Sequence, residues 1–100
     1  MPPEARLVAK IQKLLEEKGA RPFKIVGSEE GFQEAGIPDL LVCYRGAFIG
    51  LEVKQPGAEN NLRPRQKHVL RQIEDAGGIA EVVSSVEQVR RLLAKVDRKR

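Results

Sequence analysis

The sequence predicts an α/β fold in which a mixed β-sheet, built around a central β-hairpin, is flanked by helices. Three observations lead to this class. Two segments rich in Val, Leu and Ile, 40–44 and 47–53, are separated only by Arg45-Gly46. Helical apolar periodicity occurs on both sides of this pair. A further short apolar run then precedes a strongly amphipathic C-terminal segment, so the predicted order of elements is αβββαβα.

The N-terminal third is predicted as a helix, a short strand and a loop. Apolar residues recur at helical spacing between Pro3 and Lys18, and Gly19 is placed to end this helix. The apolar stripe consists of Leu7, Ile11, Leu14 and Leu15. A strand is predicted at Phe23–Val26. The polar segment Ser28–Gly36 is predicted as a loop that either contacts DNA or a second subunit or is an ordinary connector.

The hairpin strands, Leu40–Tyr44 and Ala47–Val53, carry apolar residues at nearly every position, so we expect both faces of the sheet to be covered. Cys43 is expected to be a small core residue. A second helix is predicted from Pro64, whose missing N–H costs nothing in a first turn, to Gly77-Gly78. Its apolar face is marked by Gln66, Val69, Leu70 and Ile73.

The C-terminal segment is predicted as a strand followed by a helix. Ile79–Val83 is expected to join the sheet at its edge, beside the hairpin. Ser84-Ser85 then offer helix caps, in a capping-box pattern with the polar residues three positions on. The apolar face of this helix consists of Val86, Val89, Leu92, Leu93 and Val96. The tail from Asp97 onward is expected to fray.

Composition and length indicate one soluble domain over residues 1–100. The apolar fraction is 41% and the charged fraction is 32%, as in ordinary globular proteins. No apolar run approaches the ~20 residues of a membrane span, and the first residues lack the apolar core of a signal peptide. Cys43 is the single cysteine. We therefore expect a cytoplasmic protein, in a bacterium or in the host cell of a virus, without a membrane partner.

The positive charge lies in the second half of the chain. The net charge is +4, yet residues 1–50 hold seven basic and seven acidic side chains, whereas residues 51–100 hold eleven and seven. Such asymmetry favours a polyanionic partner. Solubility alone explains the charge equally well.

The hairpin register brings two acids together. If Arg45-Gly46 forms a two-residue turn, Asp39 lies directly opposite Glu52 and Lys54 shares their face of the sheet. A four-residue loop preserves this register, whereas a three-residue loop would put the acids out of line. In the first two cases the Cβ atoms of the acids are ~5 Å apart.

Two carboxylates this close repel each other, so either one takes up a proton or a cation lies between them. Carboxylate oxygens completed by water suit Mg²⁺ or Mn²⁺. Such a cation binds a phosphate oxygen and lowers the pKa of a bound water, while Lys54 holds that water or stabilises charge on the phosphate. This chemistry is phosphodiester hydrolysis. The structural alternative is that Asp39 caps a turn after Pro38 while Glu52 and Lys54 form a surface ladder.

The same residues resemble a known nuclease signature. Pro38-Asp39, followed after twelve residues by Glu52-Val53-Lys54, is similar to the PD-(D/E)xK motif. The fuller pattern "GIPDLLV", "GLEVKQ" and "LRPRQKHVL" resembles the VRR-NUC domain, the virus-type replication-repair nucleases, from residue 36 to about 73. The resemblance implies a restriction-endonuclease-like core that cuts DNA with a divalent metal, Mg²⁺ or Mn²⁺.

The resemblance also implies roles for individual residues. The catalytic residues would be Asp39, Glu52, Lys54 and Gln66. The metal ligands would be Glu4, Asp39, Glu52 and the carbonyl of Val53. Glu4 could instead simply favour the start of the first helix through the helix dipole.

Basic side chains crowd the loop and helix that follow the motif. The predicted DNA contacts are Arg63, Arg65, Lys67, His68 and Arg71. A solvated helix face is the alternative. His68 is the single histidine, and we interpret it as a surface or phosphate-contacting residue, not as a metal ligand or general base. Four aromatic residues and no Trp provide little material for stacking on bases, which favours recognition of backbone and shape.

We therefore expect a metal-dependent DNA endonuclease that acts as a homodimer on branched or four-way (Holliday) junction DNA, as in DNA repair. A two-fold pair of sites would suit paired cuts in a symmetric substrate. The alternatives are a nuclease of other preference (a nickase, flap or non-specific duplex nuclease), a non-catalytic DNA-binding module and a structural assembly protein. The intact set of Asp39, Glu52 and Lys54 argues against the non-catalytic module.

Overall fold

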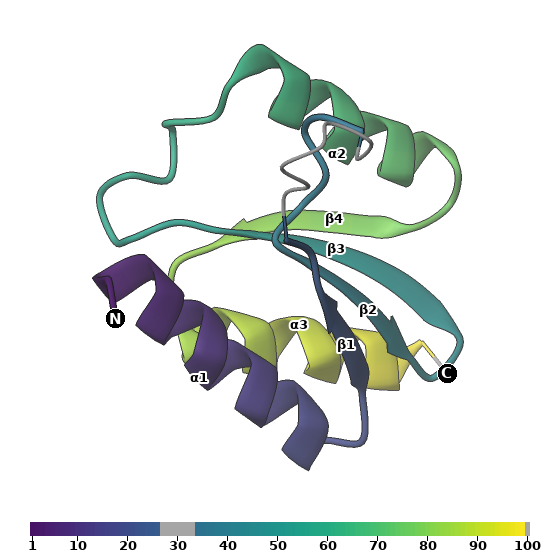
Figure 1. Ribbon diagram of the computed structural model, residues 1–100. Helices are drawn as coiled ribbons and strands as arrows, with labels where there is room; N and C mark the ends of the chain where they lie inside the picture. The colour runs from purple at the N-terminus through teal and green to yellow at the C-terminus, as the bar shows by residue number, and fades with distance from the viewer. Residues whose placement is uncertain (27–33, 100) are drawn as a thin grey trace.

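The computed structural model describes residues 1–26 and 34–99, so positions 28–33 of the expected Ser28–Gly36 loop lie outside it. The described residues form three helices and one four-stranded sheet in the predicted order (Figure 1). The elements are α1 (Pro3–Glu17), β1 (Arg21–Lys24), β2 (Leu40–Tyr44), β3 (Ala47–Val53), α2 (Pro64–Asp75), β4 (Ile79–Val83) and α3 (Val86–Arg98). None of these helices is both long and apolar enough to cross a membrane.

The predicted bounds of β2, β3 and β4 are confirmed, whereas β1 begins two residues before its predicted start. Gly19 follows α1 with φ +84° and turns the chain directly into β1, which pairs Arg21 with Cys43 and Lys24 with Leu40. The N–H of Ile25 still donates to the carbonyl of Asp39 (2.9 Å), so the pairing continues past the end of β1.

The strands lie in the order β1-β2-β3-β4, antiparallel in the first two pairs and parallel between β3 and β4. The edge position predicted for β4 is therefore confirmed. A parallel pair needs a crossover, and here α2 supplies it. Because β3 and β4 run the same way, Val53 and Val83 end side by side, and the chain leaves both strands at one end of the sheet.

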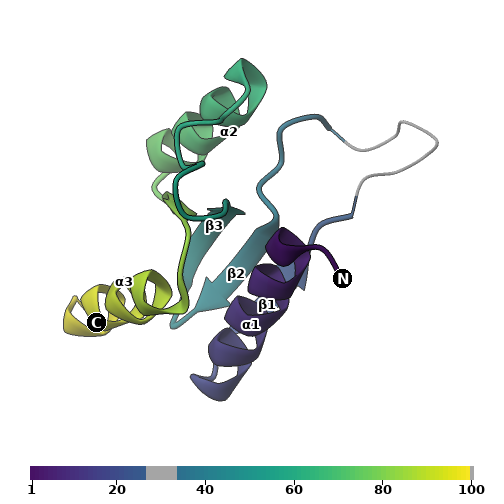
Figure 2. The ribbon, with the colours of Figure 1, turned by 90° about the vertical axis from the view of Figure 1, so that its left-hand side faces the viewer.

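The main core lies between one face of the sheet and helices α1 and α3 (Figures 1 and 2). Alternate hairpin residues point into it because side chains of a strand alternate between faces. Its fully buried side chains include Ile11, Leu15, Leu40, Ile49, Leu51, Val53, Val83 and Val89. The side chains of Ile49, Leu51 and Val53 thus anchor β3 to the α1 and α3 layer.

Among the described residues, α2 is the helix that packs on the opposite face, and the expectation that both faces are covered is wrong for part of this face. Phe48 and Phe23 are 50% and 48% exposed. Cys43 pairs with Phe48 across the hairpin and is exposed. The prediction that Cys43 is a core residue is therefore wrong. The physical reason is that α2 packs towards β4 (Figure 1) and leaves the side chains of Phe48 and Cys43 on the hairpin exposed.

The C-terminal segment is ordered further than predicted, because α3 continues through Asp97 to Arg98. The hydroxyl of Tyr44 donates to Asp97 (2.7 Å), and the guanidinium of Arg45 lies 2.8 Å from the same carboxylate oxygen. These contacts attach the last turn of α3 to the hairpin turn.

Candidate active site

The hairpin turn sets the register of the candidate site. Arg45 and Gly46 have φ values of +49° and +82°, as a two-residue type I′ turn requires. Tyr44 pairs with Ala47 across the turn, and the ladder continues to Leu40 opposite Leu51. The predicted register is thereby confirmed. Continued by one residue beyond Leu40 and Leu51, it places Asp39 opposite Glu52.

Asp39 occupies the position where the chain enters β2, directly after the fully buried Pro38. Its carboxylate accepts a hydrogen bond from the backbone N–H of Val53 (2.8 Å). The backbone ladder between β2 and β3 ends at Leu40 and Leu51, and beyond it the side chain of Asp39 accepts the hydrogen bond of the Val53 N–H. The contact also draws the carboxylate of Asp39 towards the end of β3, beside Glu52.

Glu52 is a buried acid, with 3% of its surface exposed. It points to the α2 face, since Leu51 and Val53 on either side of it point into the main core. Two side chains reach the same carboxylate oxygen: the amide of Gln66 donates to it (2.8 Å), and the ammonium of Lys54 lies 3.5 Å from it. Lys54 is itself only 17% exposed.

Gln66 links the start of α2 to Glu52. Its amide oxygen accepts from the backbone N–H of Arg63 (2.9 Å) and its amide nitrogen donates to Glu52. Gln66 is three residues after Arg63, the residue that precedes α2, and its side chain reaches back to that backbone N–H as the third residue of a capping box does. Arg63 is not one of the N-cap residues of a capping box, so the sequence alone carries no signal for this double role of Gln66.

The electrostatics of this cluster are dominated by Glu52. Burial, together with the nearby charge of Asp39, raises the pKa of Glu52 from 4.5 to about 7, and Lys54 offsets only part of this rise. At neutral pH the carboxyl group is therefore poised between its neutral and ionised forms. A cation beside the pair would favour ionisation, which is the behaviour expected of a metal-binding acid.

The donor set fits an oxygen-seeking divalent cation such as Mg²⁺. Within residues 1–26 and 34–99, no group of three or more His, Cys, Asp or Glu side chains could hold a metal. The protein therefore brings two carboxylates, Asp39 and Glu52, and the other ligands of a hydrated cation would be water, backbone carbonyl or phosphate oxygen. Mg²⁺ commonly keeps several waters and binds through one or two carboxylates.

The two remaining predicted metal ligands are Glu4 and the backbone carbonyl of Val53. Glu4 is exposed in the first turn of α1. Val53 is fully buried, and its backbone N–H is held by Asp39. Among the described residues, the structure thus brings together Asp39, Glu52, Lys54 and Gln66, with Glu4 outside this group.

The predicted DNA contacts are all on or just before α2, and all are exposed. Arg65 differs from the others because its guanidinium contacts the carbonyl of Ala35 (3.3 Å) and the carboxylate of Glu34 (3.4 Å). Gly36 packs against the backbone of Arg65 so closely that a Cβ at position 36 would lie 2.7 Å from its carbonyl oxygen. Arg65 therefore attaches α2 to the segment that leads into Asp39.

Comparisons with known proteins place this site in context. No family model and no curated protein matches the chain. A solved structure described as a VRR_NUC domain is similar to it, with a TM-score of 0.67 and 31% sequence identity. The match covers 91% of this chain and 94% of that one. The similarity thus extends over most of the chain and shows the same α/β fold.

Proposed function

We infer the reaction from one premise, which is that this chain belongs to the VRR-NUC nuclease family. It is a nuclease domain with a restriction-endonuclease-like α/β fold, and its substrate is DNA. We propose that residues 1–100 act as a metal-dependent endonuclease that hydrolyses phosphodiester bonds. The observation that carries this proposal is the buried Glu52, raised in pKa beside Asp39 and touched by Lys54 and Gln66.

Each side chain of the cluster has a distinct task. Asp39 and Glu52 would hold Mg²⁺ or Mn²⁺, with the Val53 carbonyl and Glu4 as further candidate ligands. The bound cation would supply a water of lowered pKa and neutralise charge on the phosphate. Lys54, within reach of the same space, would orient the attacking water or stabilise charge developing on the phosphate oxygens. Gln66 keeps the carboxylate of Glu52 in place through its hydrogen bond.

The DNA backbone would be held by cationic side chains of α2. The proposed contacts are Arg63, Arg65, Lys67, His68 and Arg71. The first of them, Arg63 and Arg65, flank the first turn of α2, which also carries Gln66. Phosphates bound there would lie on the DNA strand segment next to the acids, because Gln66 contacts Glu52. Because such contacts release counterions, we expect affinity to fall steeply as salt rises.

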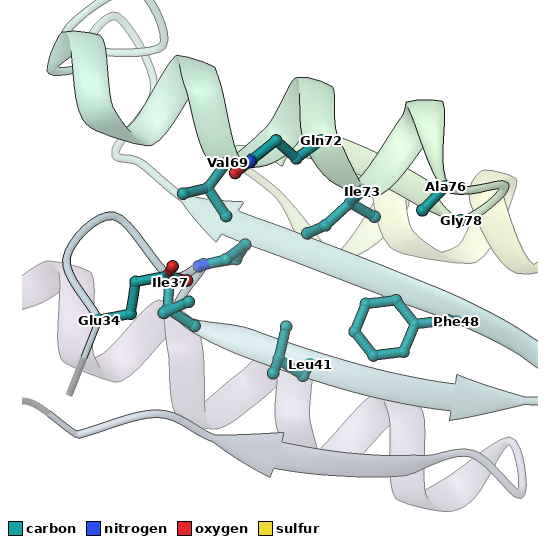
Figure 3. A pocket seen from close by; sticks show the side chains of 10 residues that line it. Glu34, Ile37, Leu41, Phe48, Val69, Gln72, Ile73, Ala76 and Gly78 are labelled. Atoms are coloured by element: carbon teal, nitrogen blue, oxygen red, sulfur yellow. The ribbon is translucent and has the colours of Figure 1, made fainter.

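A homodimer would suit branched substrates such as the four-way junction, in which two symmetric strands are cut. The exposed apolar side chains between α2 and the hairpin support this part of the proposal, and Figure 3 shows those that line the pocket there. There a groove of about 360 Å³ lies between α2 and the hairpin, with Phe48, Leu41 and Ile73 among its lining residues. An apolar surface of this kind is typical of contacts between protein chains.

Phe48→Asp is therefore expected to convert a dimer into a monomer without unfolding the chain. Phe48 is half exposed, so the substitution removes apolar area from the surface and leaves the main core intact. Sedimentation or light scattering would measure the molecular mass. Val26→Asp, at another exposed apolar residue, is the matched control. A wild-type protein that is monomeric at tens of micromolar concentration would contradict the dimer.

The proposed reaction is tested by incubating the protein with labelled four-way junction, flap and linear duplex DNA. We expect cleavage with Mg²⁺ or Mn²⁺, none with EDTA, and faster cleavage of the junction than of the duplex. Preferential cutting of flap or linear DNA would indicate a nuclease of other preference. Salt-sensitive binding without cleavage under any metal would instead indicate a non-catalytic DNA-binding module.

A further inference from the structure

A second hollow lies beside the candidate active site, on the α1 side of the sheet. It has a volume of about 250 Å³ and is formed where the first turns of α1 face the chain leaving β3 and β4. Its lining residues are Pro3, Arg6, Leu7, Lys10, Gln55, Pro56 and Ser84. In Figure 1 the N-terminal end of α1 and the segment that leaves β3 lie at the same end of the sheet.

The backbone fixes the position of this hollow relative to Lys54. The N–H of Lys54 donates to the carbonyl of Val83 (3.0 Å), so the residues that follow, Gln55 and Ser84, are held next to each other. Gln55 is the direct neighbour of Lys54, one Cα step of about 3.8 Å along the chain. One wall of the hollow is therefore continuous in the chain with the candidate active site.

The charge of the hollow is positive. Arg6 and Lys10 are one helical turn apart, which places them on the same face of α1, and both are exposed. None of the ion pairs among residues 1–26 and 34–99 includes either of them. The guanidinium of Arg6 is oriented by a hydrogen bond to the carbonyl of Met1 (2.7 Å), and its other donors are available to a ligand.

One acid, Glu59, lies beside Ser84, which lines the hollow. Hydrogen bonds to its own backbone and to the Ser84 side chain hold the pKa of Glu59 below its ordinary value, so Glu59 is ionised at neutral pH. Its charge would repel an anion from the Ser84 end. An anion in the hollow is thereby directed towards Arg6 and Lys10, with the Gln55 amide as a neutral donor.

We propose that this hollow binds a backbone phosphate of the DNA strand that is being cut, next to the scissile phosphate, through Arg6 and Lys10. The inference rests on the proposed nuclease function and extends it. The strand would then be held on both sides of Lys54, by α2 on one side and by α1 on the other. Two-sided contact fixes the direction in which the strand crosses the acids, which α2 alone would leave open.

The test is the double variant Arg6→Gln/Lys10→Gln, whose side chains are exposed and outside the core. Binding of junction DNA is measured with Ca²⁺ in place of Mg²⁺ over a range of salt concentrations. We expect the dissociation constant at 0.1 M salt to rise roughly tenfold and the slope of log affinity against log salt to fall by about 1. Cleavage at low DNA concentration should fall by the same factor.

Lys95→Gln/Lys99→Gln is the matched control, because it removes the same charge beside Ala47 and Ile79, at the other end of the sheet. If the wild type binds and cuts DNA but the Arg6/Lys10 variant behaves like this control, the phosphate site is wrong and the nuclease proposal stands. If the wild type neither binds nor cuts any of the DNA substrates, both proposals fail together.

Discussion

Asp39→Asn protein is expected to fold normally and to cut DNA at least roughly a thousandfold more slowly than the wild type. Asparagine keeps an oxygen that can accept the hydrogen bond now made by the backbone N–H of Val53, so the entry into β2 is preserved. What disappears is the negative charge that a divalent cation requires. Single-turnover cleavage of junction DNA with saturating Mg²⁺ measures the loss, and thermal unfolding verifies the fold.

Lys54→Ala should show a loss of similar size, because its ammonium lies beside Glu52 and faces the same space. Asp75→Asn removes the same negative charge as Asp39→Asn, from an exposed position at the end of α2, and serves as the control for that variant. Cleavage by Asp39→Asn or Lys54→Ala protein at the wild-type rate would show that the site is assigned to the wrong residues.

The second large effect concerns stability. In EDTA, Glu52→Gln protein should resist unfolding better than the wild type at pH 8. With Mg²⁺ present, the same variant should no longer cut DNA. The pKa of Glu52 is raised to about 7 in the folded chain from an ordinary value of 4.5, so the folded state holds this proton more tightly than the unfolded state does. The resulting stabilisation is complete below pH 4.5 and is lost as the pH rises through 7.

Each pH unit between the two pKa values is worth about 1.4 kcal/mol, so ionising Glu52 at pH 8 costs the metal-free protein about 3 kcal/mol. Glutamine has no such cost and can still accept the hydrogen bond from Gln66. Denaturant unfolding at pH 5 and pH 8 measures the difference between the two proteins, in which the other titrating groups cancel.

Added Mg²⁺ should reverse the ranking, because a cation bound only to the folded wild type stabilises it by mass action. Parallel stability curves for wild type and Glu52→Gln across this pH range, with and without Mg²⁺, would contradict the burial and the metal role of Glu52.

The hairpin was the most predictable part of the fold, since a turn of known length determines every cross-strand pair from Tyr44 and Ala47 outward. The bounds of β1 were less predictable. Its apolar residues suggested a start at Phe23, but the position of the turn after α1 decides where pairing with β2 begins, and Pro22 is tolerated because β1 is an edge strand.

Features that depend on distant contacts escaped prediction. Asp97 is ordered by Tyr44, which is 53 residues away in the sequence, and no local pattern announces that hydrogen bond. Cys43 and Phe48 are apolar residues on a strand, yet they are exposed because α2 is short and lies towards β4.

The candidate site divides in the same way. The approach of Asp39 and Glu52 follows from register alone, as argued from the sequence. The burial of Glu52, and with it the direction of its pKa, depends on how α2 docks above the end of β3. That docking involves residues from three separate segments, so only the folded structure supplies it.

The amide of Gln66 has a consequence for dynamics, since it joins the backbone at the start of α2 to the acid at the end of β3. We therefore expect fraying of that first helical turn to release the Gln66 contact with Glu52. The α1–α3 layer can remain intact while the reactive end of the sheet opens, so catalytic readiness is governed by a local equilibrium much smaller than global unfolding. We expect a cation bound to Asp39 and Glu52 to reduce fraying of the first turn of α2 through the same hydrogen bond.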